Sequence, residues 1–290
     1  MLNTQLDRDI QVEIKKPEIP VSLSPVLVDI GYSFLTNLTI EEYESLKNFL
    51  GRDTQVFRIL AAGTREYVKD GVLTWQSPGF EGTDNNGLSS GGVYRVGAGA
   101  IAMKILPEAK VIVGSKYADD SKPSPNIVMR EEIKMLGLDQ TRILSDPDTL
   151  DSIAELVRLI EICEVNGWSN GLCITNEYHC ARVLAILLNL SWLSFPIERT
   201  EAFLNGLKKI RDGELKIRVI PAEEVIKRYN ESIYNKHLKD TLGSPKIEQR
   251  KENERIGVNL IASGTYKRNK LGTSDRIILS RNGNSPVTLT

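Results

Sequence analysis

The chain has 290 residues, of which 41% are hydrophobic and 26% charged, with a formal net charge of −1. This is the composition of an ordinary globular protein, and a nearly neutral chain has no global attraction to nucleic acid or to an anionic membrane. Three cysteines without framework spacing and only two histidines argue against a disulfide scaffold and a metal site. No secretory signal opens the chain and no apolar run reaches the roughly 20 residues of a membrane span, so we expect a cytoplasmic protein.

The N-terminal part predicts an arm, which we bound at residues 1–38. Its first 25 residues carry Pro17, Pro20 and Pro25 among charged residues. A helix over 40–50 then follows, because Thr39 and Glu42 have the spacing of a capping box and Gly51 is a typical helix end.

From residue 55 onward, apolar strands alternate with segments of helical periodicity. Strands are predicted at 55–61, 109–114, 142–144, 171–174 and 215–220, and helices at 93–106, 127–136, 150–165, 178–190, 197–210 and 222–239. Strands that are apolar on both faces and alternate with helices indicate a parallel sheet covered on both sides. We therefore predict a three-layer α/β domain over 39–242, with a doubly wound, mostly parallel sheet.

The composition changes after Leu242. Residues 243–290 hold nine basic and four acidic side chains, with glycine, serine and asparagine between them. This pattern predicts a mobile or loosely docked, polar and basic C-terminal tail. A segment that binds a polyanion is the alternative, which the interleaved acidic residues disfavour.

Ligands of open parallel sheets bind beyond the carboxyl ends of the strands, so the residues after each strand define a candidate site. Polar or small residues follow each of the first four predicted strands. They are Gly63 and Thr64 after the first strand, Ser115 after the second, Asp148, Thr149 and Asp151 after the third, and Thr175, Asn176, Tyr178, His179 and Arg182 after the fourth.

The most informative pair is His179 and Arg182, which share one face in the first turns of a predicted helix. The helix N-terminus attracts anions and should lower the pKa of the imidazole. Arg95, near the start of its own helix, should face the same crevice. We expect the three side chains to hold anionic groups, and in an enzyme we assign His179 as acid or base with Asp148 or Asp151 as its orienting carboxylate. The alternative is a structural histidine beside a surface arginine.

The segment Ile174–Val183 (ITNEYHCARV) resembles the Tyr-His-x-x-Arg signature of the YdcF/SanA/ElyC-like family. The resemblance covers about residues 54–190 and implies a Rossmann-like domain of largely unknown function. It also implies S-adenosylmethionine as a possible ligand, since binding is attributed to some members. Where the family has an STNTxEN motif, this chain has 146–152 (DPDTLDS), which keeps Thr149 and shortens the glutamate to Asp151. These departures favour a non-catalytic ligand sensor or scaffold as the alternative.

Two further motifs lack the expected preceding strand. Residues 97–102 (GAGAIA) imitate a dinucleotide fingerprint, and 87–91 (GLSSG) imitate a nucleophile elbow, in which Ser89 and His179 would form a serine hydrolase. We expect, first, a domain that binds a small anionic or nucleotide-like molecule. The reaction, the cofactor and the oligomeric state are left open.

Overall fold

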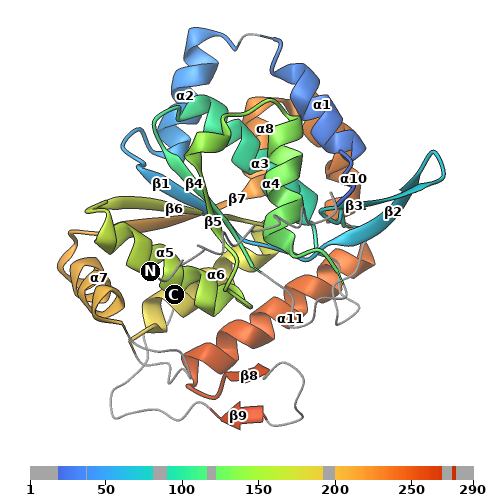
Figure 1. Cartoon of the computed structure of the whole chain (residues 1–290). Coiled ribbons are helices and arrows are strands. Elements are labelled where there is room, and N and C mark those ends of the chain that lie inside the picture. The colour runs from blue at the N-terminus through green and yellow to red at the C-terminus, as the bar shows by residue number, and fades with distance from the viewer. Residues whose placement is uncertain are drawn as a thin grey trace, which may run out of the picture.

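The structure is a computed structural model that describes residues 19–36, 38–80, 90–115, 122–191, 200–269 and 276–278. Its centre is a sheet of five parallel strands in the order β5-β4-β1-β6-β7 (Figure 1). These strands are β1 (Val56–Ile59), β4 (Lys110–Gly114), β5 (Ile143–Asp146), β6 (Asn170–Thr175) and β7 (Lys216–Pro221). The predicted α/β class with a doubly wound parallel sheet is confirmed.

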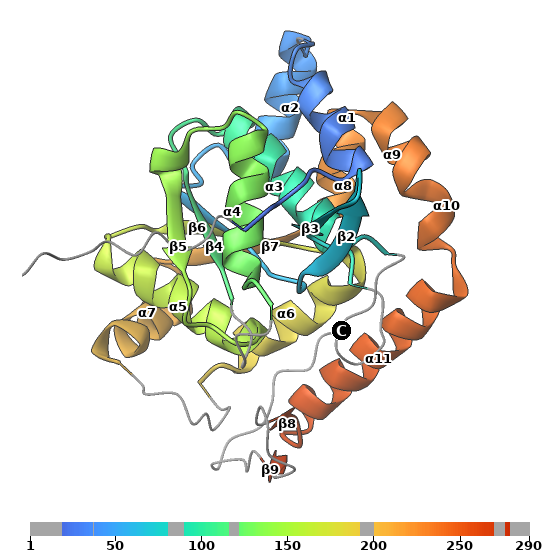
Figure 2. The ribbon, with the colours of Figure 1, turned by 45° about the vertical axis from the view of Figure 1, so that its right-hand side comes forward.

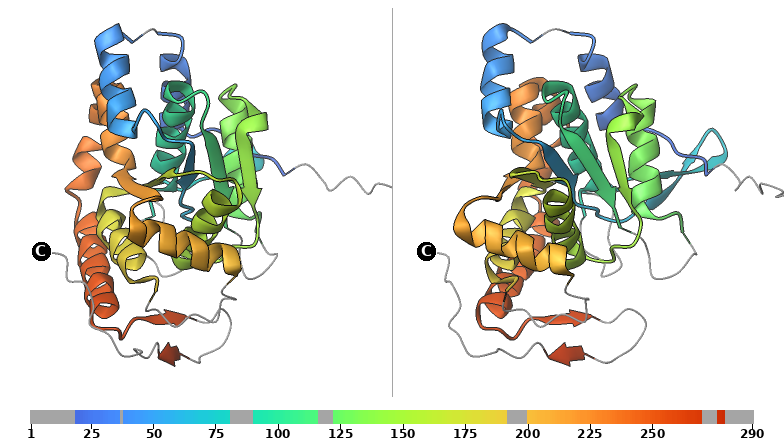
Figure 3. Two further views of the ribbon diagram at one scale, coloured as in Figure 1. Left: turned by 90° about the vertical axis from the view of Figure 1, so that its left-hand side faces the viewer. Right: turned by 60° about the vertical axis from the view of Figure 1, so that its left-hand side comes forward.

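Helices cover both faces of the sheet and give three layers (Figure 3). One face carries α1 (Pro25–Ser33), α2 (Ile40–Leu50), α3 (Gly92–Ile105), α4 (Pro125–Met135) and α8 (Ala222–Tyr229). The other face carries α5 (Ser152–Val165), α6 (Glu177–Asn189), α7 (Glu201–Asp212) and α11 (Pro245–Ala262). A short 3-10 helix, η1 (Gln140–Arg142), precedes β5.

Two hydrophobic cores lie between these layers, and the strands divide their side chains between them. Phe57 and Ile59 of β1 pack in the first core, whereas Val56 packs in the second. This two-residue period is what an extended chain buried on both faces requires.

The chain begins the sheet in its middle, at β1, and adds β4 and β5 on one side before it returns to add β6 and β7 on the other. The connections after β1 and after β6 therefore leave the sheet in opposite directions. Such a switch point opens a crevice at the carboxyl ends of the two strands, which is where open α/β sheets bind ligands.

Two elements differ from the predictions within the domain. A hairpin of β2 (Arg65–Lys69) and β3 (Val72–Gln76) was not predicted, although Asp70 and Gly71 form its turn with φ of 53° and 77°. Figure 2 shows the hairpin, whose strand β3 packs against α4. The helix predicted over 222–239 is interrupted at Asn230, whose side chain accepts from the Ile233 N–H and caps α9 (Glu231–His237) before α10 (Lys239–Leu242).

Both predicted terminal segments contain packed helices. In the arm, α1 buries Val26, Leu27 and Ile30 in the first core. The prediction of a loosely docked C-terminal tail is wrong for α11, which packs along α6 and buries Ile247 and Ile261 (Figure 1). Beyond it, β8 (Lys267–Asn269) pairs with β9 (Arg276–Ile278). Within the described ranges, none of the helices combines the length and the apolarity that a membrane span requires.

A buried arginine ties the carboxyl ends of the strands together. Arg58 of β1 is fully buried and donates to Asp146 Oδ2 at 2.7 Å and to Thr149 Oγ1 at 3.0 Å. Its Nη2 also lies 3.5 Å from Glu155 Oε1, and burial raises the pKa of Glu155 to about 6 against the effect of Arg58. A Cβ at Gly114 would lie 2.1 Å from Arg58 Nη2, so a glycine is needed there.

We expect Arg58→Leu to lower the free energy of unfolding by about 3–5 kcal/mol, because it removes the cation that contacts the buried Asp146 most closely and leaves only Arg158 at 3.9 Å. Urea denaturation measures this loss. The matched control is Arg52→Leu, since Arg52 contacts Glu44 at the surface and should cost less than about 1 kcal/mol. Equal losses in the two variants would contradict the assigned role of Arg58.

Candidate functional site

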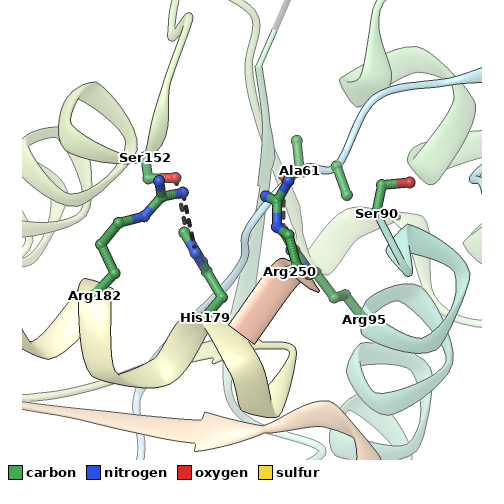
Figure 4. A pocket seen from close by; sticks show the side chains of 8 residues that line it. Ala61, Ser90, Arg95, Ser152, His179, Arg182 and Arg250 are labelled. Carbon is green, nitrogen blue, oxygen red and sulfur yellow. Dashed lines mark hydrogen bonds between the residues drawn. The ribbon is translucent and has the colours of Figure 1, made fainter. Parts of the chain in front are cut away.

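A polar pocket of about 120 Å³ lies at the switch point between β1 and β6 (Figure 4). The chain after β1 forms one wall with Ala61 and Ala62. The remaining lining consists of Ser90, Arg95 from α3, Ser152 from α5, His179 and Arg182 from α6, and Arg250 from α11. Four helices from both layers therefore contribute to one small cavity.

Arg95 is a buried cation that is held by neutral groups. Its side chain is 4% exposed and donates to the carbonyl oxygens of Leu60 at 3.1 Å and Ala61 at 2.8 Å, and to Asn176 Oδ1. Asn176 in turn donates to Glu223 Oε1 at 2.9 Å, and burial raises the pKa of Glu223. Among the described residues, no carboxylate forms an ion pair with Arg95.

His179 lies between a carboxylate and a hydroxyl. Its Nδ1 is 2.9 Å from Glu254 Oε2, and its Nε2 is 3.2 Å from Ser152 Oγ. Burial and the charge of Arg182 lower the pKa of His179 to about 3, so the imidazole is neutral near pH 7. Arg182 Nη2, which can only donate, also lies 3.2 Å from His179 Nδ1. The contact of Nδ1 with Glu254 is shorter, and an ionised carboxylate only accepts, so we place the proton on Nδ1, which leaves the Nε2 lone pair for Ser152.

Glu254 is the residue of α11 whose carboxylate contacts His179 and Arg182 of α6. Its Oε2 lies 2.8 Å from Arg182 Nε and its Oε1 lies 3.1 Å from Arg250 Nε. Burial opposes ionisation of Glu254, but His179 and the two guanidinium groups together lower its pKa to about 2. The Arg250 guanidinium also stacks 5.3 Å from the ring centre of Tyr178, whose hydroxyl donates to the Ser90 carbonyl oxygen at 2.6 Å.

The structure brings three of the predicted site residues, Arg95, His179 and Arg182, to one pocket. Asn176 and Tyr178 lie behind them and hold Arg95 and Ser90. Thr175 is fully buried at the end of β6 and is not part of the pocket lining.

Four other predicted residues shape the neighbouring turns. Thr149 accepts from Arg58 and from the Ser115 N–H, which ties two strand ends together. Gly63 has a φ of 85°, a conformation that favours glycine, and Thr64 donates to the Pro123 carbonyl oxygen at 3.2 Å.

The assignment of Asp148 or Asp151 as the orienting carboxylate of His179 is wrong, because Glu254 occupies that position. Asp151 instead caps α5 by accepting from the Ala154 N–H at 2.9 Å, and Asp148 is exposed in the turn before it. The two aspartates were chosen because they follow the neighbouring predicted strand. The carboxylate that contacts His179 belongs instead to Glu254, 75 positions further along the chain.

The structure tests the dinucleotide fingerprint at 97–102 but not the nucleophile elbow at 87–91. The dinucleotide interpretation is wrong, because α3 already begins at Gly92 and the motif lies inside the helix. There Gly99 packs against Ile59, where a Cβ would lie 2.1 Å from Cδ1. Ser89 of the nucleophile-elbow motif lies outside the described residues.

The sequence interpretation missed Ser152, Arg250 and Glu254. A signal existed for the last two, since Arg250 and Glu254 are four residues apart and share a stripe with Ile247 and Ile261. A helical stripe that mixes apolar residues with one ion pair is typical of a helix packed on a polar site.

Comparisons with models of protein families, with curated proteins and with solved structures give no match. The fold and the pocket therefore define the class of this protein: an α/β domain with a basic pocket at its switch point. The resemblance to the YdcF-like family stays a prediction.

The neutral state of His179 predicts a pH dependence of stability. A histidine titrates near 6.5 in the unfolded chain but near 3 here, so the unfolded state binds more protons as the pH falls below 6.5. Between pH 8 and pH 5 we expect the wild type to lose about 2 kcal/mol more unfolding free energy than His179→Gln.

Chemical denaturation at several pH values measures the difference between the two proteins. The comparison cancels the other titrating groups, and Glu254 contributes only below about pH 4.5. Parallel pH profiles for the two proteins would contradict the lowered pKa, because they would mean that His179 binds its proton equally well in the folded and unfolded states.

Proposed function

We propose that the switch-point pocket binds a small anionic group, a phosphate or a carboxylate, of a soluble ligand. The observation that carries the proposal is Arg95, a guanidinium with 4% exposure whose described partners are all neutral. Burying a charge lowers the stability of a protein by roughly several kcal/mol unless an opposite charge offsets it. An anion that enters the pocket would supply that charge.

Three helix N-termini add to this preference. Arg95 is the fourth residue of α3, Ser152 the first of α5 and His179 the third of α6, and all three line the pocket. The first turn of a helix carries partial positive charge, which favours phosphate and carboxylate. Ser90 supports a polar ligand too, because its buried Oγ has no hydrogen-bond partner among the described residues.

The size of the pocket limits the ligand. A volume of about 120 Å³ is well below the roughly 300–1,000 Å³ of sites that enclose a whole drug-sized ligand. It matches a phosphate or a carboxylate with a few attached atoms. S-adenosylmethionine fits less well, because its sulfonium cation would be repelled by the arginines and only its carboxylate matches them.

Inorganic phosphate is the simplest probe of this site. At a concentration 100 times its dissociation constant, phosphate should raise the unfolding free energy by about 2.7 kcal/mol. We expect Arg95→Gln to weaken phosphate binding about tenfold or more, since a charge-assisted hydrogen bond contributes about 1.5–3 kcal/mol. Titration calorimetry and thermal unfolding measure the two effects.

The matched control is Arg228→Gln, because Arg228 is on α8 and pairs with Glu224 outside the pocket. This variant should bind phosphate as the wild type does. S-adenosylmethionine is tested alongside at the same concentrations. Equal phosphate affinity in the Arg95 and Arg228 variants would contradict the proposal.

A further inference from the structure

We propose that Ser152, His179 and Glu254 form a nucleophilic relay that hydrolyses small esters bearing an anionic group. The inference rests on the proposed anion site, which would hold the charged end of such an ester. Ser152 is the last residue of the segment 146–152, for which the sequence predicted no nucleophile, and it differs from Ser89 of the nucleophile-elbow pattern.

The geometry of the relay is complete among the described residues. Ser152 Oγ is 3.2 Å from His179 Nε2, and His179 Nδ1 is 2.9 Å from Glu254 Oε2. In Figure 4, Ser152, His179 and Arg182 lie together on one side of the pocket. A hydroxyl, an imidazole and a carboxylate in this order are the arrangement that activates a serine, and it is recognised by geometry and not by sequence position.

Glu254 fixes the reactive tautomer of His179. The carboxylate accepts the Nδ1 proton, which leaves the Nε2 lone pair directed at the Ser152 hydroxyl. Arg182 and Arg250 hold Glu254 in place from both of its oxygens. Glu254 is therefore a positioning residue, whereas Ser152 and His179 would contact the reacting atoms.

The surroundings of Ser152 suit a reaction that develops negative charge. Ser152 is the first residue of α5, so it stands at the positive end of a 14-residue helix. Arg95, Arg182 and Arg250 line the same pocket. These groups would stabilise the oxyanion of a tetrahedral intermediate as well as the charged end of the substrate.

The reaction needs only water as a co-reactant. Ser152 Oγ attacks the ester carbonyl while its proton moves to His179 Nε2, and the leaving alcohol then takes that proton as the C–O bond breaks. Water next attacks the acyl-serine, gives a proton to Nε2 and forms the acid, and Ser152 regains its proton. Each step conserves the protons and electron pairs.

The bound anion would also adjust the base. Burial and then the charge of Arg182 lower the pKa of His179, and the carboxylate of Glu254 acts in the opposite direction. The charge of Arg95 lowers the pKa of His179 further. Arg250 forms an ion pair with Glu254 on the other side of the site. A ligand anion between these cations offsets their charge and raises the pKa of His179, so the imidazole becomes a better base when an anionic substrate is present.

Two esters with the same leaving group test the relay: mono-4-nitrophenyl fumarate, which carries a carboxylate that cannot reach its own ester carbonyl, and 4-nitrophenyl crotonate, which has a methyl group in its place. We expect a burst of 4-nitrophenolate, with the fumarate ester about tenfold or more faster. Ser152→Ala should lose the burst by at least about a hundredfold, and mass spectrometry should place one fumaroyl group on Ser152 of the wild type. The control Ser263→Ala changes an exposed serine at the end of α11 and should react normally.

Glu254→Gln separates positioning from binding. It should lose the burst while phosphate still binds, because the pocket becomes more positive, and Glu254→Asp should restore part of the reaction. If phosphate binds the wild type but Ser152 is not acylated, the relay is wrong and the anion site stands. If neither occurs, both proposals fail.

Discussion

The contact of Glu254 with His179 is the interaction on which the site depends. It places a carboxylate from α11 against the first turn of α6, and it decides which nitrogen of the imidazole carries the proton. Without α11, Arg182 would lose its ion-pair partner and the pocket would lose Arg250 from its wall. The helix that closes the site thus also sets its chemistry.

This contact explains why the pocket combines rigidity with positive charge. Glu254 is 2% exposed and neutralises charge on Arg182 and Arg250, so those guanidinium groups keep fixed positions. Arg95 is fixed differently, by backbone carbonyl oxygens and Asn176, which orient it without cancelling its charge. A rigid donor whose charge is intact is preorganised for an anion.

Most of the fold could be predicted from local patterns. Apolar strands such as β4 and β6 and the capping box at Thr39 and Glu42 are recorded in a few adjacent residues, and the structure contains each of them. The strands β2 and β3 were not predicted, because polar residues interrupt their apolar runs and the local signal is confined to the Asp70-Gly71 turn. The packed α11 was missed because its many charged residues concealed the stripe of Ile247, Glu254 and Ile261.

The candidate site was predictable only in part, for a physical reason. His179 and Arg182 are three residues apart on one helix, so their common face follows from the sequence. The partner of His179 is set by tertiary packing across 75 positions, and no local rule distinguishes Glu254 from the nearer Asp148 and Asp151. Sequence proximity therefore pointed to the wrong carboxylate.

The two most buried arginines of the sheet region show how a structural cation differs from a functional one. Arg58 pairs with Asp146 at 2.7 Å and has Glu155 nearby, so its charge is offset within the fold. Carboxylates also lie near Arg95, but they are directed elsewhere: Glu155 accepts from the Ala61 N–H, and Glu223 accepts from Asn176 and from the Glu177 N–H. Burial raises the pKa of both acids, which further weakens them as counterions. Both acids act on Arg95 through space, but among the described residues no carboxylate forms an ion pair with it, which is the arrangement expected where a ligand brings the opposite charge.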